Sequence, residues 1–285
     1  MTSTSMAWTA GWRLGAGMAG VVLGLALAGS ARAQGPEQVF ARFTAGSAKT
    51  VDHAIWDRQT KAYVVAGPDN LNRVRYPQWK SEGHAELKTY VKLLEATDVA
   101  ALDRPEQFAF WANLYNAKTI DIVLDKYPIK SIKDISLGGT LLSTFTGGPW
   151  KAKVAKVAGQ DLSLDDIENS VMRPIFKDPR VHYSVNCASV GCPNLMRGAF
   201  TGAGLEAQLD AGAKAFVNHP RGIAVEAGRI KASNIFSWFE ADFGGSAKAV
   251  LAHVGKHAEP ALKAKLEGIT TIADYDYDWN LNEAK

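Results

Sequence analysis

The chain has 285 residues, of which 47% are hydrophobic and 21% are charged, and this composition excludes a disordered, collagen-like or coiled-coil protein. Its formal net charge is +3, from 32 basic and 29 acidic residues. A charge so nearly balanced gives no electrostatic basis for a nucleic-acid partner.

Residues 1–33 have the pattern of a secretory signal peptide. One positive side chain, Arg13, precedes an uncharged stretch over 14–28, and Ala31-Arg32-Ala33 supplies the small residues of a cleavage site. As a helix this stretch spans about 22 Å, less than the roughly 30 Å of a bilayer's hydrocarbon core, which disfavours the alternative of an uncleaved anchor. We expect cleavage after Ala33 and a periplasmic or secreted protein with no integral membrane segment.

No repeat or low-complexity linker follows, so the sequence predicts an N-terminal helical lead-in over 34–99 and one domain over 100–282. The strongest helix signal runs from Asp103 to Tyr127. Asp103 and Glu106 form a capping-box pattern at its start, and apolar residues recur at helical spacing on more than one side. We expect this helix to be buried nearly all round.

The later elements alternate between helices and short strands. In chain order they are a glycine-rich loop over 138–150, a strand over 154–157, a helix from Ser163 ended by Pro174 and Pro179, a strand over 181–187 with alternating polarity, a helix over 205–218, a hairpin over 223–231, a helix near 236–243, two polar helices, and an edge strand over 275–282. The predicted class is α+β, a mostly helical single domain around a small, largely antiparallel sheet.

Five segments resemble a known family, domain of unknown function 547 (DUF547). They are FWANLYNA (110–117), YPIKSI (127–132), LSLDDIE (162–168), DPRVHYSVNCASVGCP (178–193) and YDWNLN (277–282). The resemblance covers roughly residues 100–282 and is densest over 105–217. It implies a fold neighbourhood and no particular reaction.

The chain has two cysteines, Cys187 and Cys192, which admit several interpretations. Export to an oxidising compartment and an even count at short spacing favour a disulfide. Alternatively, Cys187 is a thiolate nucleophile with His182 as its base and Glu168 orienting the imidazole, or both thiols are buried and inert. On a continuous strand positions 182 and 187 face opposite sides, so this dyad needs a bulge or a turn before Cys187.

Other polar residues also have two interpretations. His182 is either functional or a core histidine tied to Glu168 or to a backbone carbonyl. Asn113 and Asn116 lie three residues apart on one side of an apolar helix, so they either hold a structural hydrogen-bond network or line a binding pocket. A C-x4-C spacing with one nearby imidazole does not indicate a metal site, and no cofactor motif is present.

Two functions therefore remain open at this point. The first is an exported, non-catalytic domain that binds a small ligand, peptide or partner protein and has a local disulfide. The second is a periplasmic cysteine-dependent hydrolase or acyl transferase that uses Cys187 and His182.

Overall fold

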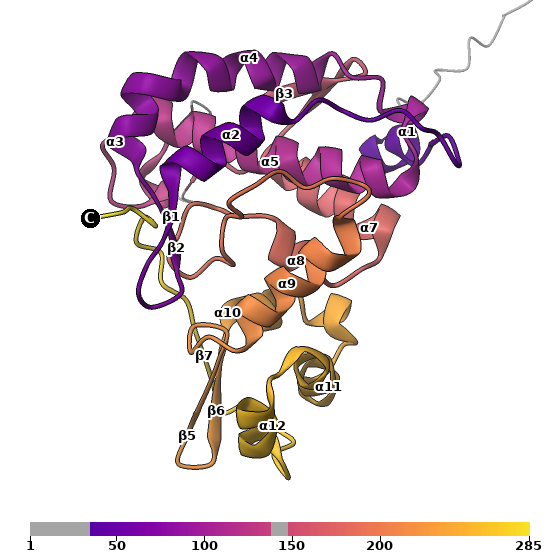
Figure 1. The fold of residues 1–285 in the computed structure, drawn as a ribbon. Coiled ribbons are helices and arrows are strands. Elements are labelled where there is room, and N and C mark those ends of the chain that lie inside the picture. The colour runs from indigo at the N-terminus through magenta and orange to yellow at the C-terminus, as the bar shows by residue number, and fades with distance from the viewer. Residues whose placement is uncertain (1–34, 138–147) are drawn as a thin grey trace, which may run out of the picture. The chain divides into compact units, whose positions relative to one another are not determined.

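The computed structural model describes residues 35–137 and 148–285, which are coloured in Figure 1. The predicted signal peptide and most of the predicted glycine-rich loop lie outside these residues. The described residues, 35–137 and 148–285, belong to one compact unit, so the described part of the predicted lead-in packs with the domain that follows it. Among the described helices, none is long and apolar enough to cross a membrane.

Short helices surround one long helix; short 3-10 or π-helical segments are labelled η. The elements of the first half are α1 (Pro36–Phe40), α2 (Ala54–Tyr63), β1 (Val64–Ala66), β2 (Asn72–Val74), α3 (Tyr76–Gln78), η1 (Trp79–Gly83), α4 (His84–Glu95), η2 (Val99–Ala101), α5 (Arg104–Lys126) and η3 (Ile132–Asp134). Those of the second half are β3 (Ala155–Val157), β4 (Gln160–Leu162), η4 (Asp166–Met172), α7 (Arg173–Phe176), α8 (Val181–Ser184), α9 (Leu205–Val217), β5 (Ile223–Glu226), β6 (Arg229–Ser233), α10 (Asn234–Trp238), η5 (Glu240–Phe243), α11 (Ala247–His257), α12 (Pro260–Leu266) and β7 (Asp274–Asp276).

The long helix α5 is the predicted buried helix. Its first turn is capped by Asp103, whose Oδ1 accepts the backbone N–H of Glu106 at 3.0 Å. Every residue from Glu106 to Leu124 is buried, which confirms the prediction. Figure 1 shows α4 lying alongside α5, and the two helices share one hydrophobic core.

The strands of the described residues form three small sheets instead of the single sheet that we predicted. Pairs β1–β2 and β3–β4 are antiparallel hairpins, and β5–β6–β7 is a three-stranded sheet in which only β6–β7 is parallel. Ala227 and Gly228 join β5 to β6 with φ values of 48° and 73°, as a tight hairpin turn requires. The structure confirms a mostly helical α+β fold with largely antiparallel pairing.

A second hydrophobic core lies under the β5–β6 hairpin and α11. It consists of buried residues from α8 to the segment after α11, including Tyr183, Phe216, Phe236, Phe243 and Val250. The first and second cores meet near α8, where Val181 belongs to one cluster and Tyr183 to the other. This helical turn therefore has no solvent-facing side.

The predicted strand over 181–187 is wrong. Residues Val181–Ser184 form the helical turn α8, and the backbone extends only from Val185 onward. The turn begins where Oδ1 of Asp178 accepts the N–H of Arg180 at 2.8 Å. All four residues of α8 are buried, so the alternating polarity of this segment does not correspond to one buried and one solvent-exposed face.

Two other predicted boundaries also differ. The helix after Ser163 continues past Pro174 to Phe176, because Pro174 lies in the first turn of α7, where a missing N–H costs little. The predicted helix over 236–243 is interrupted at Phe239 between α10 and η5.

Of the predicted C-terminal strand, only β7 pairs with a sheet. The residues after it run beside the 188–191 backbone, where Val190 N–H donates to Asn280 O at 2.8 Å and Gly191 N–H donates to Asp278 O at 2.8 Å. Farther along, Val74 N–H donates to Asn282 O at 2.8 Å, which places the C-terminus beside β1–β2 in Figure 1. The tail therefore carries side chains from the far end of the chain to the cysteine segment.

Candidate functional site

A cavity of about 180 Å³ lies between α5, η4, α8, the cysteine segment, α10 and the C-terminal tail. We call it the aromatic cavity. Its lining residues are Tyr115, Trp150, Asp165, Glu168, Asn169, His182, Val185, Cys187, Cys192, Pro193, Ile235, Trp238, Phe239, Tyr277 and Trp279. The three residues of the predicted catalytic group, Glu168, His182 and Cys187, are all among them.

Four aromatic rings form one continuous wall of this cavity. The centroid of Tyr277 lies 4.6 Å from that of Trp279 and 4.8 Å from that of Trp238. Trp150 approaches Trp279 edge-on, with centroids 5.7 Å apart. The side chain of Trp238 is 47% exposed, so this ring borders the solvent side of the wall.

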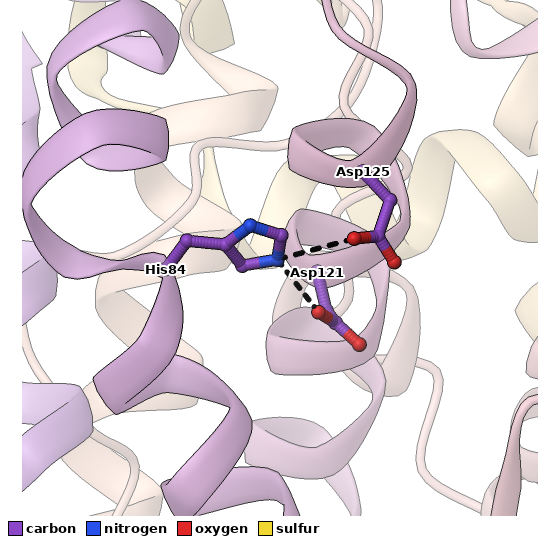
Figure 2. A group of neighbouring side chains, drawn as sticks. All are labelled: His84, Asp121 and Asp125. Atoms are coloured by element: carbon purple, nitrogen blue, oxygen red, sulfur yellow. Dashed lines mark hydrogen bonds and ion pairs between the residues drawn. The ribbon is translucent and has the colours of Figure 1, made fainter.

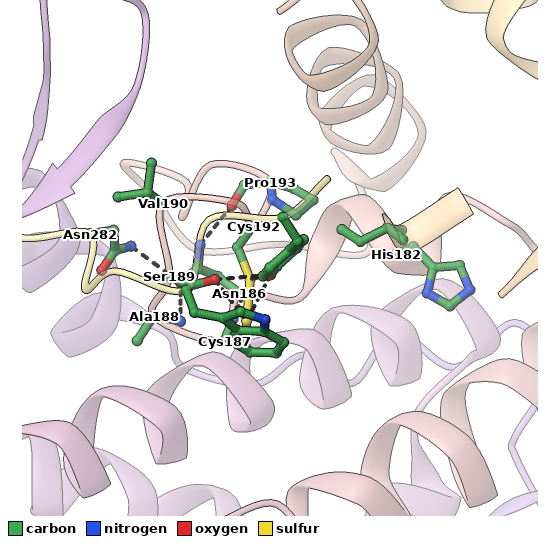
Figure 3. Close-up of a disulfide and its surroundings, with 12 residues drawn as sticks. His182, Asn186, Cys187, Ala188, Ser189, Val190, Cys192, Pro193 and Asn282 are labelled. Carbon is green, nitrogen blue, oxygen red and sulfur yellow. Dashed lines mark hydrogen bonds between the residues drawn. A yellow bond between two sulfur atoms is a disulfide. The ribbon is translucent and has the colours of Figure 1, made fainter. Parts of the chain in front are cut away.

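Cys187 and Cys192 form a disulfide, as predicted, with Cα atoms 6.3 Å apart (Figure 3). The hydroxyl of Tyr277 lies 3.1 Å from Sγ of Cys187, 3.0 Å from Sγ of Cys192 and 2.9 Å from Oγ of Ser189. Burial raises the pKa of Tyr277, so its hydroxyl stays protonated and is available as a donor. The tail is thereby attached to the disulfide at its side-chain atoms as well as along its backbone.

Asn116 fixes the backbone that leads into the disulfide. Its Nδ2 donates to Ser184 O at 2.8 Å, and its Oδ1 accepts the Asn186 N–H at 2.8 Å. The side chain of Asn186 in turn donates to Pro193 O at 2.6 Å and accepts the Ala188 N–H at 2.8 Å. Asn116 thus lies in a structural hydrogen-bond network and is not among the cavity-lining residues.

Asn113 holds a different segment in the same way. Its Nδ2 donates to Phe200 O at 2.9 Å, and its Oδ1 accepts the Phe200 N–H at 3.0 Å. Its side chain is fully buried and does not line the aromatic cavity. Of the two interpretations of these asparagines, the structure places both in hydrogen-bond networks.

His182 lies between two carboxylates. Its Nε2 is 2.7 Å from Oδ2 of Asp242, and its Nδ1 is 3.5 Å from Oε1 of Glu168. The imidazole stacks on Phe239, with ring centroids 4.1 Å apart. Burial alone lowers the pKa of His182, but the hydrogen bond to Asp242 and the neighbouring Glu168 carboxylate together raise it above the ordinary 6.5.

Asp242 is shared between His182 and an arginine. Nε of Arg173 donates to Oδ2 of Asp242 at 2.5 Å, and its Nη2 donates to Oδ1 at 3.0 Å, which makes a two-pronged ion pair. The hydrogen bond from His182, followed by that from Arg173, holds the pKa of Asp242 well below its usual range despite partial burial. Asp242 is therefore an acceptor, and we assign the proton on His182 to Nε2 from this network.

The remaining ring nitrogen of His182 has no hydrogen-bond partner within the described part of the chain. This Nδ1 is buried and faces Glu168 on the π-helical segment η4; π-helical turns are frequent at functional sites. Burial and then the charge of Glu168 raise the pKa of the nearby Tyr115. Unpaired buried polar atoms are uncommon in folded proteins, so this nitrogen calls for an explanation.

The predicted Cys187–His182 dyad has no direct contact. Cys187 is bonded to Cys192, and its sulfur contacts Ser189 and Tyr277, whereas Nε2 of His182 is bound to Asp242. In Figure 3 the imidazole lies apart from the disulfide and points away from it. The two residues share the lining of one cavity without being hydrogen-bonded to each other.

A comparison with family models adds an identification. Residues 99–217 match the model described as "Protein of unknown function, DUF547". This region of the chain belongs to the DUF547 family. Comparisons with curated proteins and with solved structures return no significant match.

The DUF547 region supplies only part of the aromatic cavity. Tyr115, Glu168, His182 and both cysteines lie inside it, whereas Asp242 and the aromatic residues Trp238, Tyr277 and Trp279 lie beyond residue 217. The sequence analysis did not identify Asp242 or Trp238. A signal existed only for Tyr277 and Trp279, whose alternation with polar residues places them on one side of the tail.

A second group of polar residues lies elsewhere in and beside the DUF547 region, formed by His84, Asp121 and Asp125 (Figure 2). Lys88 Nζ donates to Asp121 Oδ1 at 2.9 Å and to Asp125 Oδ1 at 3.1 Å, and Lys118 Nζ donates to Asp121 Oδ2 at 2.8 Å. Burial would raise the pKa of Asp121, but these lysines and His84 lower it to about 2. Two ammonium groups already balance the two carboxylates, so this group is an ion-pair network and not a vacant metal centre.

Proposed function

We propose that this chain is an exported, non-catalytic domain that binds a small ligand in the aromatic cavity, with the Cys187–Cys192 disulfide as part of the cavity wall. The observation that carries the proposal is the unpartnered Nδ1 of His182, buried at the cavity. Leaving such an atom unpaired costs about 1–3 kcal/mol, and a ligand atom that hydrogen-bonds to it removes this cost. A volume of about 180 Å³ is below the roughly 300–1,000 Å³ of pockets for drug-sized ligands, so it suits a small molecule or one side chain of a peptide.

Export is part of this proposal. Its support is the signal-peptide pattern over 1–33 together with a disulfide, a bond that persists in oxidising compartments and is rare in the cytosol. Cell fractionation followed by N-terminal sequencing tests it. A mature protein that begins at Gln34 supports the proposal, and an exported product that still begins at Met1 contradicts it.

The ligand-binding part is tested with a panel of small amines, sugars and carboxylic acids. Binding is followed by tryptophan fluorescence and by the shift in melting temperature. We expect at least one class of probe to bind the wild-type protein and to bind Trp238→Ala at least about tenfold more weakly. The control is Phe43→Ala, because Phe43 is similarly exposed at 44% but does not line the cavity. If no probe binds, or if every probe binds both variants equally, the cavity is not the binding site.

The alternative function is a periplasmic cysteine-dependent hydrolase or acyl transferase. One observation favours it, which is that Cys187 and His182 line the same cavity. It requires a reduced Cys187, because a sulfur within a disulfide is not an acyl-transfer nucleophile. Rapid iodoacetamide labelling of Cys187 in the freshly isolated protein, slowed by His182→Ala, supports the alternative. Labelling that appears only after addition of dithiothreitol supports the binding domain.

A further inference from the structure

We infer that the ligand of the aromatic cavity carries a primary ammonium group on a short apolar body. This inference rests on the proposed function, because it names the class of ligand that the same cavity binds. It follows from the charge of the lining, from the two acceptors that have no strong donor, and from the aromatic wall.

The charges around the cavity exclude an anion. Asp165 and Glu168 line it, and Asp242 lies behind His182, so three carboxylates face the single guanidinium of Arg173. Among the described residues no lysine or arginine is part of the lining. Arg221, which lies near Tyr277, binds Val190 O and Asn194 Oδ1 instead of a cavity carboxylate. The lining itself has two carboxylates and at most one cation, His182, so it is negative whether or not His182 is protonated, and an anionic ligand would be repelled.

Glu168 is a lining carboxylate that faces His182 and has no lysine or arginine partner among the described residues. Its side chain is 13% exposed. When His182 is neutral, its proton lies on Nε2 and is donated to Asp242, so Nδ1 is then an acceptor that faces Glu168. Nδ1 and the Glu168 carboxylate are 3.5 Å apart, which lets one ammonium group with several N–H donors serve both.

The aromatic wall favours the same chemistry. The faces of Trp and Tyr rings carry negative electrostatic potential and attract cations. Trp279 already shows this behaviour within the molecule, since Nζ of Lys133 lies 5.1 Å from its ring centroid. The apolar body of an alkyl amine would lie against Trp238 and Tyr277 while its ammonium group approaches Glu168.

Four probes of similar size separate the contributions. They are n-butylammonium, n-butanol, butyrate and tetramethylammonium, titrated into the full-length mature protein by calorimetry. We expect n-butylammonium to bind at least about tenfold more tightly than n-butanol, and butyrate not to bind. Tetramethylammonium has no N–H group, so it should bind more weakly than n-butylammonium; equal affinity would overturn the assignment to a primary ammonium.

Matched variants assign the effect to residues. Glu168→Gln keeps the size of the side chain and removes its charge, and it should weaken n-butylammonium binding about tenfold or more while leaving n-butanol unchanged. Glu226→Gln makes the same change of charge at an exposed position of the β5–β6 hairpin and should have no effect. An equal loss in both variants would reduce the role of Glu168 to the net charge of the protein and overturn the inference.

Three further results lead to different conclusions. If lysine Nα-acetyl-methylamide binds as tightly as n-butylammonium, the natural source of the amine is a lysine side chain of a peptide; if it binds much more weakly, the source is a free amine. If n-butanol or a methyl glucoside binds in a Trp238-dependent way and n-butylammonium does not, the ammonium inference is wrong and the cavity remains a binding site. If no probe in either panel binds, both proposals are wrong.

Discussion

Nε2 of His182 lies 2.7 Å from Oδ2 of Asp242, although 60 residues separate them in the chain. Asp242 also accepts two hydrogen bonds from Arg173, so one carboxylate connects α7, α8 and η5. This arrangement fixes the orientation of the imidazole and leaves its other nitrogen at the aromatic cavity. The position of the candidate site therefore depends on a residue that does not line it.

Asp242→Asn tests this dependence. The amide removes the negative charge from both partners, so we expect a lower pKa of His182 and a loss of about 1–2 kcal/mol in the free energy of unfolding, which allows for the 26% exposure of the side chain. NMR titration of the imidazole and urea denaturation measure the two effects. Asp161→Asn is the control, because its carboxylate is 65% exposed and forms only a 3.9 Å pair with Lys156. An unchanged His182 titration in Asp242→Asn would show that this contact does not set the pKa.

The pH dependence of stability has a defined sign at His182. Its pKa is raised in the folded protein, so the native state holds this proton more tightly than the unfolded chain. The stabilising contribution is complete below pH 6.5 and is lost as the pH rises through the folded pKa. The groups that face His182 are Glu168, Asp242 and, behind it, Arg173. In His182→Gln the free energy of unfolding should fall less than in the wild type between pH 6 and 8.5, as measured by urea denaturation at each pH.

His253 should have the opposite effect. Its Nε2 lies 2.9 Å from the hydroxyl of Tyr183, and burial, then the neighbouring His257 and Lys256, lowers the pKa of His253 to about 4. The neutral form is favoured by folding, so stability is present above pH 6.5 and is lost as the pH falls toward 4. His253→Gln should flatten the acid side of the stability profile and leave the alkaline side unchanged. A variant whose profile matches the wild type below pH 6.5 would contradict the assignment.

The disulfide should stabilise the fold modestly. The Cys187–Cys192 bond closes a loop with a sequence separation of 5, and the chain-entropy model gives about 2 kcal/mol for so short a loop. Cys192→Ser should therefore stay folded, and its free energy of unfolding, measured by urea denaturation, should be about 2 kcal/mol lower than that of the wild type. Dithiothreitol should destabilise the wild type equally and leave the variant unaffected. A larger loss would indicate that the bond also supports the contacts of Tyr277.

Asn116 should matter more than its position outside the cavity suggests. Asn116→Ala leaves Ser184 O and Asn186 N–H without a partner, and each unpaired buried group costs about 1–3 kcal/mol. Asn116→Asp keeps the acceptor for Asn186 and loses the donor to Ser184. We expect both variants to be destabilised in thermal and urea denaturation. Both should also bind cavity probes more weakly, because the disulfide segment is no longer fixed. Wild-type stability in Asn116→Ala would show that water replaces both hydrogen bonds.

The elements that could be predicted from sequence are those with strong local signals. Helix α5 has a capping residue, Asp103, and a long apolar pattern, and the β5–β6 hairpin has a glycine at its turn, so both were identified correctly. The 181–187 segment was misjudged because His182 and Ser184 are polar yet buried, with partners inside the protein. A polar residue that is satisfied internally looks, in sequence, like one that faces solvent.

The candidate site was only half predictable for a related reason. Glu168, His182 and Cys187 were identified because they lie close together in motifs of the chain, and all three line the cavity. Asp242 gave no local signal, and Trp238 lies on a short helix whose orientation is set by tertiary contacts. Tyr277 reaches the sulfurs only because the tail runs beside residues 188–191, a pairing that no sequence pattern encodes.

The C-terminal tail has a kinetic consequence. Tyr115 and Trp279 line one small cavity and lie far apart in the chain, so forming the cavity requires contacts of long sequence separation, which form slowly. A partly folded chain would have its helices and lack the cavity. An occupant would consequently recognise only the completed molecule and slow its degradation by proteases, so that occupancy and lifetime would rise together.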